Sequence, residues 1–183
     1  MDRSRTPEVK ILVSAGSKHG ATAEIAERIG NVLRERGFAA TVANPKDAID
    51  LSEYDAFVLG SAVYAGHWLD NAKNLAERVA GCDPELGTWL FSSGPIGDPP
   101  KPEEEPVDVA DIVAATSARD HRVLSGKIDK SKLSFAEKAI LIAVRSPEGD
   151  FRDWTEIEAW AGCIADTINA ETTDLGAAST RSR

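Results

Sequence analysis

The chain has 183 residues, of which 42% are hydrophobic, and this fits a single globular domain with a sizeable core. Its formal net charge of -9 at pH 7 would repel nucleic-acid phosphates, so nucleic acid is not an expected partner. Cys82 and Cys163 form no C-x-x-C pair, and neither a thioredoxin-like site nor a metal site is expected. No signal-peptide pattern and no membrane-spanning stretch is recognised, which predicts a cytoplasmic protein.

The first structural unit, residues 9–29, reads as a strand, a loop and a helix. The apolar run 9–13 is typical of a buried parallel strand, and helical periodicity begins after Thr22 and ends at Gly37. The loop between them is small and polar. The first N–H groups of a helix lack internal partners and carry partial positive charge, so this loop suits a phosphate group. An ordinary strand-to-helix turn capped by Thr22 is the alternative.

Strands and helices alternate along the rest of the chain. The predicted strands are 38–42, 56–60, 88–92 and 121–124, and the predicted helices are 69–79, 107–115, 135–144 and a last one opening at Asp153. Such alternation implies an α/β fold, with five parallel strands and helices on both faces. Ligands of these sheets bind beyond the carboxyl ends of the strands. The loops after the first, third and fourth strands therefore form the candidate site.

The other two loops have a composition that suits a flat heterocycle. Residues 60–68 combine small residues and glycines with Tyr64 and Trp68, and residues 92–97 are again small and polar. A heterocycle needs room for its edge, N–H groups for its polar atoms and a ring on which to stack, so the three loops together favour a flavin site. The alternative is that both are plain connecting loops whose aromatic side chains pack on a neighbouring helix.

The first loop and the start of the helix after it resemble the N-terminal signature of the flavodoxin family. The resemblance is carried by Ser17, Gly20, Thr22, Ala26 and Ile29, and Ala15 stands where the family usually has an aromatic residue. It extends over about residues 9–125. It implies a flavodoxin-like, doubly wound sheet of strand order 2-1-3-4-5, with FMN as the cofactor of a flavoprotein.

The resemblance also implies which residues bind FMN. The phosphate would be held by Ser17, Lys18, His19, Gly20, Ala21 and Thr22. The isoalloxazine would lie between Ser61, Ala62, Val63, Tyr64, Ala65, Gly66 and Trp68 on one side and Ser93, Gly94, Pro95 and Gly97 on the other. Because the third loop has no aromatic residue, ring stacking is assigned to Tyr64 or Trp68. No catalytic residue is assigned; His67 is a candidate, and a solvated loop residue is its alternative interpretation.

Within the family, the chain looks similar to bacterial menaquinone-dependent protoporphyrinogen dehydrogenases. The similar features are residues 17–22 (SKHGAT), residues 60–66 (GSAVYAG) and Asp153-Trp154 at the start of the last helix. This implies an FMN-dependent oxidoreductase that transfers two electrons from a porphyrinogen-like substrate to a quinone-type acceptor. The second loop has no acidic residue before Asp70, which favours a mild reduction potential. A non-enzymatic electron carrier and a flavin-free scaffold are the alternatives.

Two further segments interrupt the expected single domain of residues 9–170. Residues 98–108 are acidic and rich in proline, which predicts a solvated surface loop or, alternatively, a docking strip for a basic redox partner. Residues 127–152 contain an extra apolar helix, with a capping box at Ser134 and Glu137. Basic residues flank it: Lys127, Lys130, Lys132, Lys138, Arg145 and Arg152.

An apolar helix flanked by basic residues suits contact with the anionic inner face of a membrane near a lipid quinone. The alternatives are a helix that covers the core of the domain and a helix that forms a homodimer interface. Residues 1–8 are predicted to be flexible and residues 171–183 disordered.

Overall fold

The computed structural model describes residues 8–181 except 48, 83, 95–105 and 144–147. Its centre is a parallel sheet of order β2-β1-β3-β5-β6, with β4 added on β3. The strands are β1 (Lys10–Gly16), β2 (Ala39–Ala43), β3 (Ala56–Tyr64), β4 (His67–Trp68), β5 (Gly87–Ser93) and β6 (Asp120–Leu124). The predicted order 2-1-3-4-5 is confirmed, because β5 and β6 take the fourth and fifth places.

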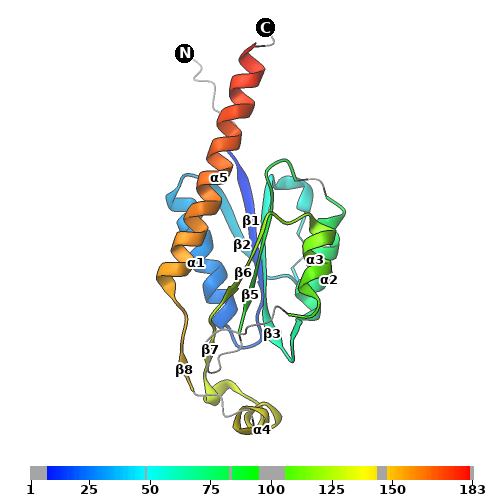
Figure 1. Ribbon diagram of the computed structural model, residues 1–183, viewed down its shortest axis with the longest axis vertical. Helices are drawn as coiled ribbons and strands as arrows, with labels where there is room; N and C mark the ends of the chain where they lie inside the picture. The colour runs from blue at the N-terminus through cyan, green and yellow to red at the C-terminus, as the bar shows by residue number, and fades with distance from the viewer. Residues whose placement is uncertain (1–7, 48, 83, 95–105, 144–147, 182–183) are drawn as a thin grey trace.

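Helices cover both faces of the sheet (Figure 1). The helices α1 (Ala21–Glu35) and α5 (Trp154–Arg181) pack on one face, and α2 (Asp70–Ala80) and α3 (Val109–Thr116) pack on the other. Side chains of β1 alternate between the two cores: Ile11 and Val13 face α1 and α5, and Leu12 faces α2 and α3. Burial on both sides explains why this strand is one apolar run in the sequence.

Gly60 makes room for an aromatic pair in the core. It lies in β3, in parallel register with Phe91 of β5, and a Cβ atom on Gly60 would lie 2.3 Å from the Phe91 ring. The Phe91 ring meets Trp160 of α5 edge-on, with 6.0 Å between the ring centroids. A residue without a side chain at position 60 thus allows the sheet and α5 to pack through two large rings.

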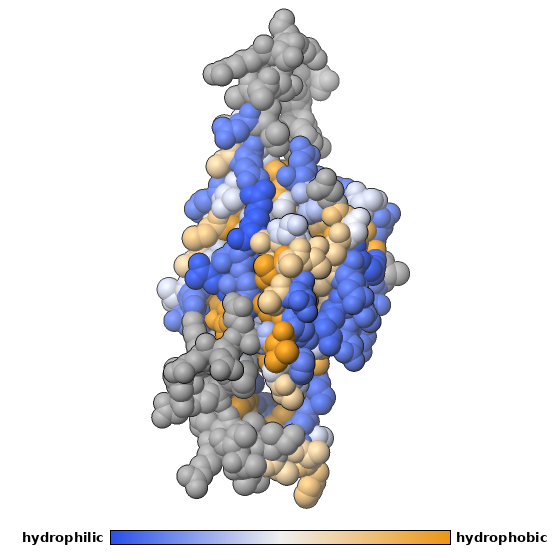
Figure 2. All heavy atoms as spheres, turned by 45° about the vertical axis from the view of Figure 1, so that its right-hand side comes forward, coloured by the Kyte–Doolittle hydropathy of each residue, from blue (hydrophilic) through white to orange (hydrophobic). Residues whose placement is uncertain are grey.

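Between β6 and α5 the chain makes an insertion that projects from the end of the sheet at which the strands terminate (Figure 1). It consists of β7 (Lys127–Ile128), the 3-10 turn η2 (Lys130–Lys132), α4 (Phe135–Ala143) and β8 (Gly149–Asp150). β7 and β8 pair in antiparallel fashion and form its stem. Phe135 is 94% exposed, and Figure 2 shows apolar atoms at this lower tip of the molecule.

The insertion is held by a helix cap and by an arginine. The predicted capping box forms: the Ser134 N–H donates to Glu137 Oε2 at 2.8 Å, and the Glu137 N–H donates to Ser134 Oγ at 3.4 Å. On the stem, the Arg152 side chain is only 3% exposed and pairs with Asp150 at 2.5 Å and with Glu24 of α1 at 2.7 Å. Arg152 therefore attaches the stem to the body of the domain.

Several segments differ from the sequence-based expectations. The predicted loop 60–68 is mostly strand, because β3 continues to Tyr64 and β4 follows. A disordered tail is predicted from Glu171, whereas α5 continues to Arg181. A 3-10 turn, η1 (Leu51–Glu53), precedes β3. Residues 1–7 and most of the acidic stretch 98–108 lie outside the described residues. In the described part of the chain, no helix combines the length and apolarity that crossing a bilayer requires.

Candidate functional site

The first loop of the candidate site leaves the N-terminus of α1 open. β1 ends at Gly16, and α1 begins at Ala21 after Gly20, whose φ of 95° favours glycine. Ser17 Oγ accepts a hydrogen bond from the Gly20 N–H at 3.0 Å, which closes the loop on itself. Among the described residues, the Ncap position of α1 supplies no side-chain cap. The N–H groups of its first turn, including that of the buried Thr22, therefore remain for an outside acceptor, as an anion site requires.

The second loop is a tight hairpin rather than a flexible connection. Tyr64 of β3 pairs with His67 of β4, and the two turn residues Ala65 and Gly66 have φ values of 49° and 80°. Below the turn, Ser61 is fully buried; its Oγ accepts from the Leu69 N–H at 2.9 Å and donates to a backbone carbonyl at 2.8 Å. The Ser61 hydroxyl thus builds the base of the hairpin and is already occupied.

Trp68 belongs to the core and not to the surface of the site. Its side chain is 2% exposed, and its indole Nε1–H donates to Ser92 Oγ at 2.8 Å. It packs in the cluster under α2 and α3. The expectation that Trp68 could stack on a flavin ring is corrected, because the indole is buried among core side chains. Of the two candidate aromatic residues, Tyr64 remains for stacking.

Tyr64 lies beside the first loop. Lys18 Nζ is 5.2 Å from the centroid of the Tyr64 ring, and the His19 ring meets it edge-on at 6.4 Å. Burial, and then the negative charge of Glu137, raise the pKa of Tyr64 to about 12. The structure therefore brings together the predicted phosphate loop and the predicted stacking residue, which are distant from each other in the sequence.

The third loop is joined to the start of the insertion. Ser93 is buried at the end of β5, and the N–H of Gly94 donates to the Leu124 carbonyl at 3.3 Å. A Cβ atom on Gly126 would lie 3.2 Å from the Gly94 Cα, so the two backbones approach closely. Ala62 pairs with Ser93 in the sheet, which places the second and third loops next to each other. The predicted residues Pro95 and Gly97 lie outside the described residues.

His67, the candidate catalytic residue, is the β4 residue that pairs with Tyr64 in the hairpin. It is 52% exposed, and its Nδ1 lies 3.4 Å from Asp108 Oδ2. Asp108 also accepts a hydrogen bond from the Trp68 N–H at 3.2 Å and lies 3.5 Å from Lys73 Nζ. Next to it, the Val107 N–H donates to the Gly66 carbonyl at 2.8 Å. The segment before α3 thus clamps the hairpin, a role of Asp108 that the sequence pattern does not indicate.

Glu137 has a second role that sequence reasoning missed. Its Oε1 lies 2.5 Å from Lys18 Nζ and 3.1 Å from His19 Nε2. The hydrogen bond from Lys18, followed by those from Ser134, holds the pKa of the Glu137 carboxyl well below its usual range. Lys132 Nζ also donates to the His19 carbonyl at 3.4 Å. The capping box identified Glu137 in the sequence, but nothing in a separation of 119 residues indicates this contact.

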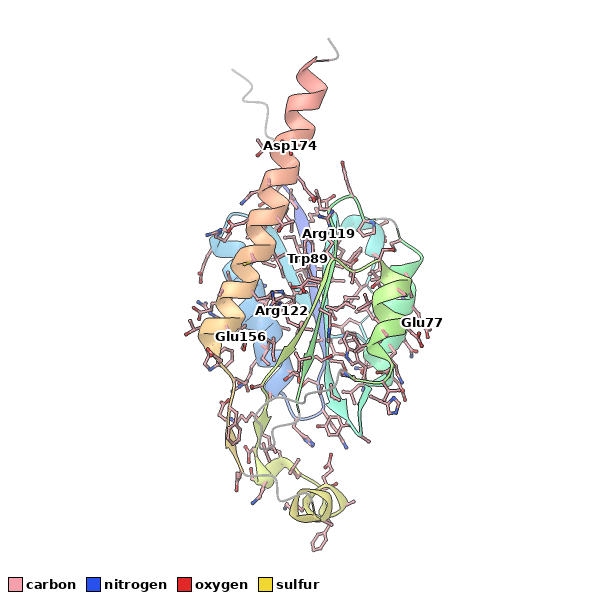
Figure 3. All side chains as sticks on the ribbon, in the orientation of Figure 1. Glu77, Trp89, Arg119, Arg122, Glu156 and Asp174 are labelled. Atoms are coloured by element: carbon pink, nitrogen blue, oxygen red, sulfur yellow. The ribbon has the colours of Figure 1, made fainter. Side chains whose placement is uncertain are left out.

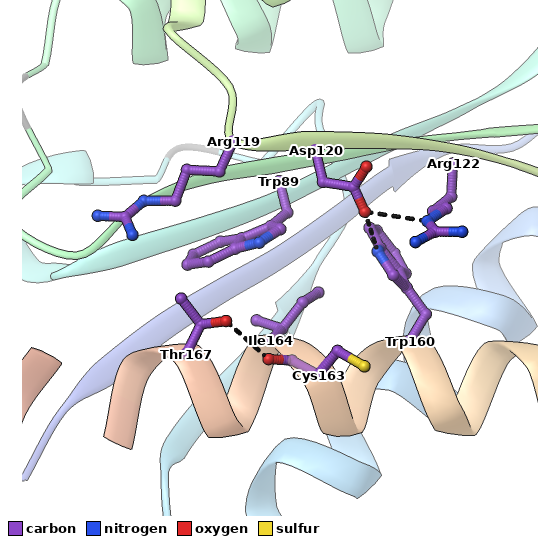
Figure 4. A pocket seen from close by; sticks show the side chains of 8 residues that line it. All are labelled: Trp89, Arg119, Asp120, Arg122, Trp160, Cys163, Ile164 and Thr167. Carbon is purple, nitrogen blue, oxygen red and sulfur yellow. Dashed lines mark hydrogen bonds and ion pairs between the residues drawn. The ribbon is translucent and has the colours of Figure 1, made fainter. Parts of the chain in front are cut away.

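A separate groove of about 450 Å³ lies between the edge strand β6 and α5 (Figure 4). It is lined by Trp89, Arg119, Asp120, Arg122, Trp160, Cys163, Ile164 and Thr167. Within the groove, Asp120 accepts hydrogen bonds from Trp160 Nε1 and Arg122 Nε, both at 2.9 Å. These three polar side chains of the groove therefore pair with one another. Figure 3 shows Trp89 and Arg119 far from α4 and from the carboxyl ends of the strands. The groove is thus distinct from the three loops. The described residues include no cluster suited to a metal ion.

Fold and loops together define a flavodoxin-like α/β protein. The family model of the flavodoxin domain matches residues 12–155. The chain therefore belongs to the flavodoxin domain family. No curated protein matches it.

Solved structures agree with this fold. A flavodoxin from the domain Archaea is 17% identical with a TM-score of 0.56, and covers 88% of this chain and 99% of its own. A flavodoxin from Streptococcus pneumonia is 17% identical with a TM-score of 0.58, covering 89% and 99%. The rubredoxin:oxygen oxidoreductase of Desulfovibrio gigas is 16% identical with a TM-score of 0.58, covering 88% of this chain and 36% of its own. Membership of the family indicates FMN as the cofactor.

Proposed function

We propose that the protein is an FMN-dependent oxidoreductase whose cofactor phosphate binds at the N-terminus of α1. The observation that supports this most is the uncapped first turn of α1 next to the partly buried Tyr64, at the carboxyl end of a parallel sheet. The Thr22 hydroxyl and the first N–H groups of α1 would hold the phosphate, and Lys18 and His19 would supply charge. The Tyr64 ring and the adjoining strand ends would hold the isoalloxazine. FMN supplies the redox chemistry.

The charges around the hairpin support a mild reduction potential. The second loop itself has no acidic residue before Asp70, but the fold brings Asp108 to the hairpin and Glu137 to the first loop. At the hairpin, the Asp108 carboxylate lies 3.5 Å from Lys73 Nζ, which pairs with its charge. The negative charge of Asp108 is therefore partly offset, and extra electrons on a nearby ring are not strongly disfavoured. This supports two-electron transfer from a porphyrinogen-like substrate to a quinone-type acceptor, the reaction that the resemblance implies.

The exposed tip of the insertion supports a peripheral membrane contact. Phe135 is 94% exposed at the start of α4, and Lys130 and Lys132 precede it in η2. An apolar side chain with neighbouring cations suits an anionic lipid surface, from which a lipid quinone could reach the ring. Co-sedimentation with vesicles that contain anionic lipid, lost in Phe135→Ser, is the expected result. Homodimers in place of vesicle binding would assign the tip to a subunit interface.

Two measurements on the purified protein test the proposed function. Reconstitution with FMN is expected to give one bound flavin per chain. The loaded protein is then expected to oxidise protoporphyrinogen with a quinone as acceptor. Bound FMN without turnover, together with electron exchange with a redox protein, would identify a non-enzymatic carrier instead. Failure to bind any flavin would leave a scaffold with a flavodoxin fold and would contradict the proposal.

A further inference from the structure

Glu137 of the insertion contacts the two basic side chains of the proposed phosphate loop. Its Oε1 lies 2.5 Å from Lys18 Nζ and 3.1 Å from His19 Nε2, and its side chain is only 15% exposed. Within residues 17–22, Lys18 and His19 are the side chains that can carry positive charge. A carboxylate from a distant part of the chain thus occupies the basic groups that an incoming phosphate would use.

The position of this carboxylate is fixed by its own helix. Glu137 Oε2 accepts a hydrogen bond from the Ser134 N–H at 2.8 Å, so one oxygen serves the cap of α4 while Oε1 faces the loop. Lys132 Nζ adds a bond to the His19 carbonyl at 3.4 Å. Because these contacts come from η2 and α4, the insertion and the loop are tied together.

We propose that Glu137 is an internal competitor for the cofactor phosphate and thereby a determinant of flavin specificity. This rests on the proposed function of the loop. A phosphate dianion at the N-terminus of α1 attracts Lys18 and His19 and repels the Glu137 carboxylate, so it displaces Glu137 from them. A flavin that lacks the phosphate has no group that competes for Lys18 and His19, and Glu137 stays in place. The affinity for FMN therefore includes the cost of this displacement, whereas the affinity for riboflavin does not.

Equilibrium titrations of flavin fluorescence with cofactor-free protein test the proposal. Glu137→Gln keeps the shape of the side chain and removes its charge, and it is expected to tighten FMN binding about tenfold, or about 1.4 kcal/mol. Riboflavin binding is expected to change less than about twofold. Glu148→Gln is the matched control, because Glu148 lies in the same insertion, is 52% exposed and contacts Lys130 rather than the loop. It is expected to leave both affinities unchanged.

A second background shows whether the effect passes through the loop. In Lys18→Met, the further change Glu137→Gln is expected to tighten FMN much less than it does in the parent protein. Hydrogen exchange of residues 130–138 supplies a readout independent of affinity: FMN is expected to speed it, and riboflavin is not.

Three results would overturn the proposal. The first is an FMN affinity that Glu137→Gln leaves unchanged or weakens, and the second is an equal gain for riboflavin, which would make α4 a simple steric cover. The third is an undiminished gain in the Lys18→Met background. Failure of the parent and all variants to bind either flavin would instead refute the proposed function itself.

Discussion

Trp68→Phe distinguishes a core residue from a cofactor-binding residue. The substitution removes the hydrogen bond from Trp68 Nε1 to Ser92 Oγ, while Ser92 keeps His121 Nε2 at 2.8 Å as a partner. Losing one buried hydrogen bond of this kind costs about 1–2 kcal/mol. The smaller ring leaves roughly 40 Å³ unfilled, which adds about 1 kcal/mol at ~24 cal/mol per Å³. The free energy of unfolding should therefore fall by about 2–3 kcal/mol.

Urea denaturation measures this change. With a slope of about 2 kcal/mol per M, the midpoint should fall by about 1–1.5 M with no change in slope. FMN affinity, measured under conditions in which the variant is fully folded, should stay within about twofold, because the indole faces the core.

Tyr64→Leu should behave in the opposite way. Loss of a stacked aromatic ring costs about 0.5–1.5 kcal/mol, so FMN should bind about two- to twelve-fold more weakly. Its midpoint should fall less than that of Trp68→Phe, since Tyr64 is only partly buried. The reasoning is refuted if Trp68→Phe weakens FMN binding more than Tyr64→Leu does, because Trp68 would then contact the ring.

Three further predictions concern the loop, the core and pH. Thr22→Ala should weaken FMN binding about tenfold or more, because a hydrogen bond to a charged group contributes about 1.5–3 kcal/mol; an unchanged Kd in a titration would show that the loop is misassigned. Gly60→Ala should lower the thermal midpoint by at least several degrees through its clash with Phe91, whereas Gly162→Ala, where a Cβ atom meets nothing within 4 Å, should raise it slightly. Because the pKa of Tyr64 is raised to about 12, its phenol stabilises the fold fully below pH 10 and loses that effect as the pH rises from 10 to 12; Tyr64→Phe should flatten this part of the stability curve, and an unaltered curve would contradict the assignment.

The sequence predicts the sheet well because its apolar strand runs and its helical apolar spacing are both pronounced. The apolar runs of β1 and β3 identify buried parallel strands, and their alternation with helices predicts a parallel sheet. The order of the strands comes from the resemblance to the flavodoxin family. The first loop is also predictable, since Gly20 and the apolar spacing after Thr22 mark the start of a helix.

Features that depend on contacts between distant residues were not predictable. The sequence does not indicate the hairpin of β3 and β4, because its turn has Ala65, a residue type that rarely adopts a positive φ, before Gly66. The sequence places Trp68 in a loop, and only the fold shows that its indole donates a hydrogen bond to Ser92 in the core. Glu137 contacts Lys18 because the stem of the insertion is attached to α1, and the spacing of residues in the sequence does not predict this contact.

The most direct test of the account is a titration of ¹⁵N-labelled, cofactor-free protein with FMN, followed through its backbone amide resonances. Saturable binding of one flavin per chain is predicted, with the largest shifts at residues 17–22, and further shifts at Tyr64 and Gly94. Saturation accompanied by shifts around Arg119 and Arg122 alone, or no saturable binding, would contradict the claim that the N-terminus of α1 anchors the cofactor phosphate.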